Sequence, residues 1–240
     1  MLTLRDIEQQ FGFEYPAVYH RMGAAQMLDW MRGWNEPWTK TRNWYTEVYP
    51  TLVDNPPLFL HNKDFEIYTF DEIVKQLNTI PDYWDKQHQF VPIGMNGAGD
   101  WYAFYYTGIT GSDIPIVFAP HDDENATYLA KNMEDFIFRM LLEYVADIDD
   151  DEIEDMEENT GKNFKTNILA MLDSHQLYLL PAHFKILEEI YNRTVNEFDY
   201  GLNLRNTYKG RGLLDETELK QIMKNNIYFD KLDTEFKFML

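Results

Sequence analysis

The sequence predicts an α+β fold, in which an antiparallel sheet is flanked by helices and followed by a helical C-terminal extension. Residues 90–93 and 100–106 are rich in β-branched and aromatic residues and flank a glycine-rich bend, as paired strands do. Apolar residues recur at spacings of three and four over residues 133–145, which predicts an amphipathic helix. The composition then changes sharply, because residues 147–158 hold nine acids and no base.

This change in composition also predicts how the chain is divided. We expect a first domain over residues 1–147, an acidic boundary over residues 148–158 and a helical extension over residues 159–240. Capping pairs and apolar spacing predict helices in the first domain at residues 3–11, 16–25, 69–77 and 133–145. Strands are predicted there at residues 58–60, 65–68, 90–93, 100–106 and 114–119. The extension carries helical patterns near residues 164–173, 181–197 and 215–225.

The charge of the chain limits its partners. Among 240 residues, 41 are acidic and 21 are basic, which gives a net charge of -20. Nucleic acids and anionic membranes are bound through phosphates, which require Lys and Arg, so we expect no direct nucleic-acid partner and no membrane partner. A strongly acidic protein is attracted instead to basic protein surfaces.

The chain contains no cysteine, which excludes disulfides, thiolate metal sites and a cysteine nucleophile. That composition suits a reducing compartment. The first residues show no basic segment followed by an apolar one, so we expect no secretory signal. No apolar run approaches the roughly 20 residues of a membrane span. We therefore expect a cytoplasmic protein, and the oligomeric state stays open.

The stretch FVPIGMNGAGDWYAFYY, residues 90–106, has a glycine-rich bend that could be a phosphate loop or a strand connection. A phosphate loop needs Lys followed by Ser or Thr after its last glycine, whereas Gly99 is followed by Asp100 and Trp101. A dinucleotide site needs a helix there, and the aromatic run is typical of a strand. We therefore predict a structural turn made by Gly94, Asn96, Gly97 and Gly99.

The same bend resembles a known family. Pro92-Ile93-Gly94 followed by Asn96-Gly97-Ala98-Gly99-Asp100-Trp101 is similar to the hairpin of the SUKH superfamily. That superfamily includes fungal cell-wall-synthesis regulators and many bacterial immunity proteins. The order of elements over residues 1–147 is also similar, although the tryptophan-rich segment at residues 30–44 looks like an insertion. The last ninety or so residues have no counterpart in the resemblance.

The resemblance implies binding rather than catalysis. Bacterial members commonly sit on a cognate toxin, often a nuclease, and block it. The acidic charge independently fits this role, because the surfaces with which nucleases hold phosphates are basic. We therefore expect an immunity protein whose partner is a cognate toxin or another basic protein. A regulatory or scaffolding interaction protein is the alternative.

Aromatic residues next to acids are typical of protein interfaces, which makes them candidates for the binding surface. Burial in the core is the competing interpretation for the aromatic strand, and anchoring of a long connection is the competing one for the tryptophan-rich segment. The acidic residues 147–158 fit a hydrated linker, with a phosphate-mimicking surface or a weakly docked helix as alternatives. The candidate partner-binding residues are Asp100, Trp101, Tyr105, Asp122, Asp123, Glu124, Trp34 and Trp38.

An enzyme is the least favoured class. A metal-dependent hydrolase would have to use His121, Asp122 and Glu124, because carboxylates and histidine can bind a cation or move a proton. Neighbouring residues point in different directions, however, and no second motif at ligand spacing supports them. No serine lies in a Gly-x-Ser-x-Gly turn, and no histidine pair has the spacing of a zinc protease. We therefore predict no catalytic residues, no metal and no cofactor.

Overall fold

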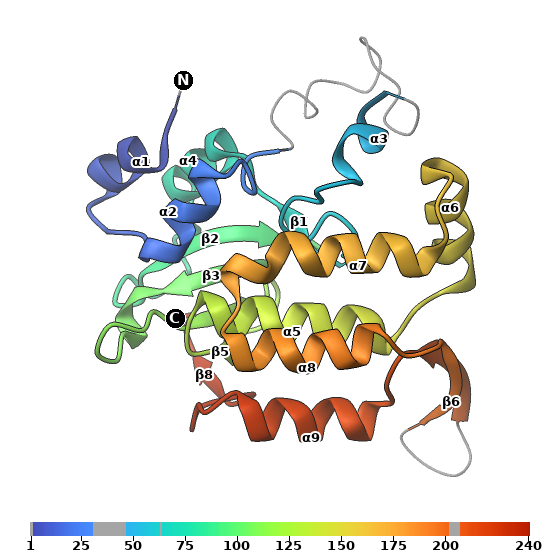
Figure 1. Cartoon of the computed structure of the whole chain (residues 1–240). Coiled ribbons are helices and arrows are strands. Elements are labelled where there is room, and N and C mark those ends of the chain that lie inside the picture. The colour runs from blue at the N-terminus through green and yellow to red at the C-terminus, as the bar shows by residue number, and fades with distance from the viewer. Residues whose placement is uncertain (1, 31–46, 63, 202–206) are drawn as a thin grey trace. The chain divides into compact units, whose positions relative to one another are not determined.

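The structure is a computed structural model that describes residues 2–30, 47–62, 64–201 and 207–240 (Figure 1). The chain forms two compact units. The first unit comprises residues 1–40, 58–136 and 229–240, and the second comprises residues 41–57 and 137–228. The division falls inside helix α5 (Met133–Ala146), between Phe136 and Ile137.

Among its described residues, the first unit contains a six-stranded sheet and three α-helices that precede α5. The strand order is β1-β2-β3-β4-β5-β8, and each neighbouring pair is antiparallel. The predicted α+β class is therefore confirmed. The helices are α1 (Leu4–Phe11), α2 (Ala17–Ala24) and α4 (Phe70–Asn78). The strands are β1 (Glu66–Ile67), β2 (Phe90–Met95), β3 (Trp101–Tyr105), β4 (Ile116–Ala119), β5 (Asn125–Ala130) and β8 (Glu235–Lys237).

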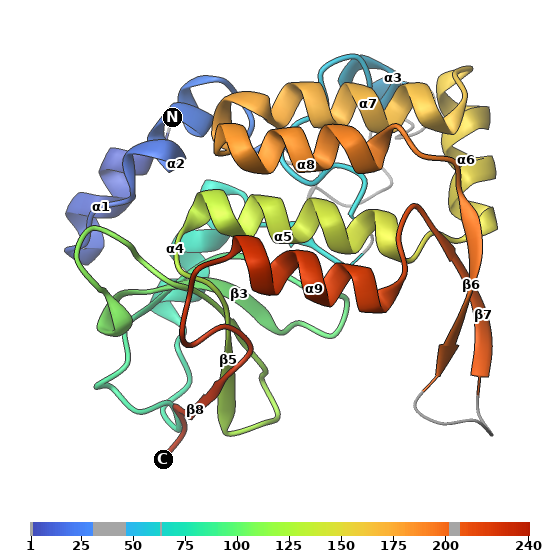
Figure 2. The ribbon, with the colours of Figure 1, turned by 60° about the horizontal axis from the view of Figure 1, so that its bottom comes forward.

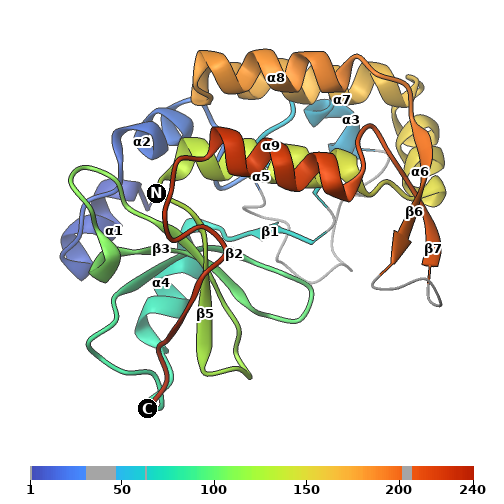
Figure 3. The ribbon, with the colours of Figure 1, turned by 90° about the horizontal axis from the view of Figure 1, so that it is seen from below.

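Local sequence explains where the helices of this unit begin. The side chain of Thr3 accepts a hydrogen bond from the backbone of Asp6, and the carboxylate of Asp6 accepts one from the backbone of Thr3. Thr69 and Glu72 form the same reciprocal box at the start of α4. Each box satisfies backbone donors that the first helical turn leaves without partners. Helix α4 then packs on β2, and α1 packs on α4 (Figure 3).

Strand β3 supplies aromatic rings to both faces of the sheet, as alternation along a strand requires. On one face, Phe104 packs edge-on against Tyr19 of α2, with ring centroids 5.1 Å apart. On the other face, Tyr105 stacks on Phe236 of β8 at 4.6 Å, and Trp101 contacts Trp84 at 4.9 Å. Both faces are therefore covered, the second by residues 84–90 together with the last residues of the chain.

The second unit is mainly helical. Helices α7 and α8 lie side by side, joined by the 3-10 turn η3, and strands β6 and β7 form a separate two-stranded ribbon (Figure 2). Within this unit, the hydroxyl of Tyr191 donates to the carbonyl of Leu141 at 2.9 Å, which ties α8 to the later part of α5. The elements are α3 (Tyr49–Leu52), α6 (Asp150–Thr160), α7 (Phe164–His175), η3 (Gln176–Tyr178), α8 (Pro181–Tyr191), β6 (Asn196–Gly201), β7 (Thr207–Gly212) and α9 (Glu216–Asn226).

Several segments differ from the sequence-based expectations. Residues 58–60 form turns instead of a strand, and the helix predicted to reach residue 197 ends at Tyr191, after which β6 begins. The acidic stretch is a helix, not a linker: α6 buries Met156, and Ile148 just before it is also buried. The predicted boundaries at residues 147 and 159 do not coincide with the compact units. In particular, residues 229–240 belong to the sheet unit, because β8 pairs with β5.

Candidate functional site

The glycine bend connects β2 to β3 and is held by the side chain of Asn96. Its amide oxygen accepts hydrogen bonds from the backbone nitrogens of Ala98 at 3.0 Å and Asp100 at 2.9 Å. Gly99 has φ +91°, a conformation that favours glycine. Gly94 is required for a different reason, since an added Cβ would lie 2.4 Å from the carbonyl oxygen of Glu66 on β1. Residues 96–100 therefore form a turn that leads directly into β3, whereas Gly94 lies within β2 itself.

Asp100 connects this bend to the turn between β4 and β5. Because Trp101 pairs with Ala119, the residue before β3 and the residues after β4 lie opposite each other. One carboxylate oxygen of Asp100 accepts hydrogen bonds from the backbone nitrogen of His121 at 3.0 Å and from its Nδ1 at 2.6 Å. The other oxygen accepts from the Asn96 amide at 2.9 Å.

The protonation of Asp100 follows from these contacts. Burial opposes ionisation of the carboxyl, but the hydrogen bonds from His121 and Asn96 outweigh it, so the pKa of Asp100 lies below its usual value. Asp100 is thus a charged structural residue. It is buried, so its role is to hold the two turns together.

Residues 121–124 form the exposed turn that Asp100 holds in place. Asp122, Asp123 and Glu124 all face solvent. Asp123 accepts a hydrogen bond from the backbone nitrogen of Asn125 at 2.9 Å, which stiffens the turn. Glu124 forms an ion pair with Lys237 at 2.5 Å, between the start of β5 and β8. The three predicted acidic candidates therefore lie together on one exposed turn.

The metal hypothesis named His121, Asp122 and Glu124. The structure groups His121 and Asp122 with Asp100 instead, with one ligand atom from each lying within 4.8 Å of the others. Strand pairing brings Asp100 next to His121. Because the two residues are 21 positions apart in the sequence, no local motif predicts that they meet. Both oxygens of Asp100 already accept hydrogen bonds, so the cluster as it stands is a hydrogen-bonded connection between two turns.

The aromatic candidates of strand β3 are not on the surface. Trp101 is 7% exposed and Tyr105 is 4% exposed, because residues 84–90 and β8 cover that face of the sheet. The hydroxyl of Tyr105 lies 2.6 Å from Nδ1 of His88, so this buried hydroxyl has a hydrogen-bond partner. These two rings stabilise the sheet and are not available to a partner. Trp34 and Trp38 lie outside the described residues.

Helix α6 carries a second acidic surface. Two of its exposed acids have partners: Asp150 forms an ion pair with Arg211, and Glu157 accepts a hydrogen bond from the backbone nitrogen of Phe164. Between residues 147 and 158, all of which the structure describes, five exposed acids make neither an ion pair nor a side-chain hydrogen bond: Asp147, Asp151, Glu154, Asp155 and Glu158. The apolar spacing of Ile148, Ile153 and Met156 was the sequence signal for this helix.

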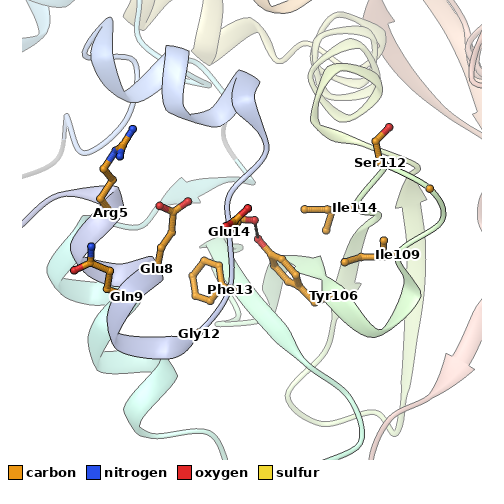
Figure 4. A pocket seen from close by; sticks show the side chains of 11 residues that line it. Arg5, Glu8, Gln9, Gly12, Phe13, Glu14, Tyr106, Ile109, Ser112 and Ile114 are labelled. Carbon is orange, nitrogen blue, oxygen red and sulfur yellow. Dashed lines mark hydrogen bonds between the residues drawn. The ribbon is translucent and has the colours of Figure 1, made fainter.

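The first unit forms a groove beside α1 that no sequence motif indicates (Figure 4). Its volume is about 770 Å³. One wall comes from α1 and the segment that follows it, and the other comes from the connection between β3 and β4. Phe13 and Tyr106 pack together at 5.3 Å between ring centroids, and Ile109 is exposed at the edge. Residues 100 positions apart form this groove, so no local motif marks it.

A family model described as the SMI1 / KNR4 family (SUKH-1) matches residues 3–139, which is more than half of the chain. The chain belongs to this family. The SUKH-1 region begins at the capping box of α1 and contains the bend, the acidic turn and the groove. It stops within α5, so α6 and the elements after it lie outside the SUKH-1 match. Neither the curated proteins nor the solved structures yield a match to this chain.

Among the helices that the structure describes, none combines the length and the apolar character needed to cross a bilayer.

Proposed function

We propose that this protein is a cytoplasmic immunity protein that binds a cognate bacterial toxin and blocks it by occlusion. The observation that carries the proposal is membership of the SUKH-1 family, whose members are in general non-enzymatic immunity proteins. The excess of acids supports it. The first unit has 21 acids and 10 bases, and the second has 20 acids and 11 bases, so both units are negatively charged.

A binding mechanism follows from where the charges lie. The turn at residues 121–124 and the outer side of α6 present carboxylates to solvent. A toxin that cuts or modifies nucleic acid holds phosphates with Lys and Arg, and carboxylates on a partner can occupy the same side chains. Unpaired surface charges also speed encounter, because their field extends over roughly a Debye length of about 8–10 Å.

The direct test is protection from the product of the adjacent gene. That product is expressed alone, with this protein, and with an unrelated acidic protein of equal net charge as the control. We expect growth to be restored only by this protein, together with co-purification of the two chains in a fixed ratio. Equal toxicity in all three cultures, or rescue by the control, would count against the immunity role.

A kinetic test isolates the electrostatic part. We expect the association rate with the toxin to fall by about tenfold between 50 and 500 mM salt, because screening removes charge steering. Replacing Asp122 and Asp123 with Asn, or Glu154 and Asp155 with their amides, should each reduce the slope of rate against salt. A salt-independent rate in the unmodified protein would remove the charge-based mechanism while leaving binding intact.

The alternative is a regulatory or scaffolding role, which the fungal side of the SUKH resemblance would suggest. The two roles predict different partners. A stable complex with a host protein in cells that carry no toxin gene, together with absence of protection, would favour the scaffolding role.

A further inference from the structure

The groove of the first unit combines an apolar floor with charged edges. Its floor is made by Phe13, Tyr106 and Ile114, and Ile109 is 47% exposed at one side (Figure 4). An isoleucine exposed beside two packed rings can be buried further by an incoming apolar group, which is favourable. The volume of about 770 Å³ lies in the range of roughly 300–1,000 Å³ that binding pockets occupy.

The carboxylates of Glu8 and Glu14 line the groove next to this floor. Glu8 is fixed in position, because its Oε1 accepts from the backbone nitrogen of Tyr15 at 2.7 Å and lies 2.8 Å from Nε2 of His20. Glu14 is exposed. Arg5 lines the groove at the α1 side and is the one cationic residue among those lining it. The acids therefore outnumber the bases here, as they do over the whole first unit.

The two walls are also connected across the groove. The hydroxyl of Tyr106 donates to the backbone carbonyl of Glu14 at 2.7 Å, which joins the end of β3 to the segment after α1. This bond uses the backbone of Glu14 and leaves its carboxylate available to a ligand. A preformed site of this kind loses little conformational entropy when it binds.

We propose that this groove takes an extended segment of a partner protein in which an apolar side chain is followed or preceded by Lys or Arg. The apolar side chain packs on Phe13, Tyr106 and Ile109, and the cation pairs with Glu14 and Glu8. This inference deepens the proposed function, since it names the recognition site of the same partner, and it rests on that function only for the identity of the partner.

The first experiment uses no toxin. A displayed library of random twelve-residue peptides is selected against the full chain, the Ile109→Lys variant and the Ile80→Lys variant. Ile80 is the matched control, because it is 42% exposed in the same unit and does not line the groove. Thermal unfolding first verifies that both variants fold as the parent does.

We expect enriched peptides to pair an apolar residue with Lys or Arg, and we expect this enrichment to survive Ile80→Lys and disappear with Ile109→Lys. A synthetic peptide from the enriched set should bind at least about tenfold more weakly to Ile109→Lys and to Glu14→Lys, as loss of an anchor predicts. An Asp82→Lys variant, which reverses an exposed acid away from the groove, should bind within about twofold of the parent. No enrichment, enrichment of acidic peptides, or equal enrichment by both isoleucine variants would overturn the inference.

A second experiment separates the groove from the immunity role. Affinity for the adjacent-gene toxin should fall by about tenfold or more in Ile109→Lys and change little in Ile80→Lys. Equal toxin affinity in both variants would overturn the groove and leave the immunity role standing. Absence of protection by the unmodified protein would remove the immunity role and leave the peptide selection as an independent result. A change of oligomeric state confined to Ile109→Lys would assign the groove to a second copy of the chain and overturn the proposal.

Discussion

The two compact units carry nearly the same excess of acids, yet burial raises the pKa of an aspartate in the first and lowers the pKa of a histidine in the second. In the first unit, Asp135 is 1% exposed near the start of α5, and burial raises its pKa to about 6. In the second unit, His175 is fully buried at the end of α7, and burial lowers its pKa to about 4. Burial favours the neutral form in both cases.

The consequence at neutral pH is different in the two units. Asp135 is ionised above its raised pKa, so the first unit holds a buried charge whose desolvation costs free energy. The ion pair with Lys131, at 3.8 Å, offsets part of that cost. His175 is neutral, and its Nδ1 lies 2.7 Å from the carbonyl oxygen of Met171, which can only accept, so that nitrogen carries the proton. Acid therefore favours the folded state through Asp135 and disfavours it through His175.

The largest expected effect tests where the first unit ends. Phe238 is fully buried against Trp84 at 4.8 Å and Phe90 at 5.5 Å. Phe238→Ala should destabilise the protein by about 3–5 kcal/mol, because it leaves a cavity in the aromatic core. Urea unfolding monitored by tryptophan fluorescence measures this.

The control for that substitution is Leu240→Ala, two residues further on, where the side chain is exposed. It should change the free energy of unfolding by less than about 0.5 kcal/mol. Equal small effects at both positions would mean that the end of the chain does not close the sheet core.

The same residues show what the sequence could and could not predict about the fold. The two capping boxes and the apolar spacing of α5 are local signals, and they gave those helices correctly. Strand β8 has three residues and pairs with β5 more than a hundred positions earlier, so its place depends on a long-range contact that no local pattern records. Without β8, one face of β3 looked available to a partner. Trp101 and Tyr105 are interface candidates by sequence, with core burial as the competing interpretation, and the structure places both in the core.

The next largest effect is the loss of stability in acid that we expect from the buried histidine of the second unit. In the unfolded chain His175 takes up a proton near pH 6.5, whereas in the folded protein it does so only near pH 4. Stability from this group is therefore complete above about pH 6.5 and is lost as pH falls toward 4, by about 3 kcal/mol in total. Urea unfolding at pH 4.5, 5.5 and 6.5 measures the slope.

The matched variant is His175→Asn, whose amide can still donate to the Met171 carbonyl but does not titrate in this range. Its absolute stability will be lower, since the ring is lost from the core, so the slope is the informative quantity. We expect a flatter dependence than in the parent protein. Identical slopes would show that His175 does not govern acid sensitivity.

We expect the stability contributed by Asp135 to depend on pH in the opposite direction to that contributed by His175. Its folded pKa is raised from 3.8 to about 6, so the stability from this group is present below about pH 4 and is lost as pH rises through 6. Asp135→Asn should therefore stabilise the protein at pH 8 by about 1–2 kcal/mol, after allowing for the lost attraction to Lys131. Near pH 4 the gain should vanish. A gain that is the same at both values would point to packing rather than charge.

The candidate site was predictable to a similar extent. Asp122, Asp123 and Glu124 are consecutive and polar, so they are candidates by sequence, and in the structure they lie on one exposed turn. The groove could not be found in this way, because Phe13 and Ile109 meet only when α1 and the β3–β4 connection pack on each other. No local pattern predicts the charge of the groove either, because Glu8 lies in an amphipathic helix and Glu14 in the segment after it.

The smallest expected effect distinguishes acids that stabilise α6 from acids that do not. Asp151 lies in the first turn of α6, where the helix dipole favours negative charge, so Asp151→Asn should destabilise the protein by a few tenths of a kcal/mol. Glu158 lies in the last turn, one turn after Glu154, where both the dipole and the like charge are unfavourable. Glu158→Gln should therefore stabilise the protein by about 0.3–0.5 kcal/mol.

Thermal unfolding at low salt measures the change in stability of both variants, and added salt should reduce both changes. If Glu158→Gln stabilises the chain and also slows its association with the toxin, the carboxylate is retained for binding against its cost to stability. If both variants are destabilising, the acids of α6 contribute to the fold, and the partner surface of the second unit must lie elsewhere.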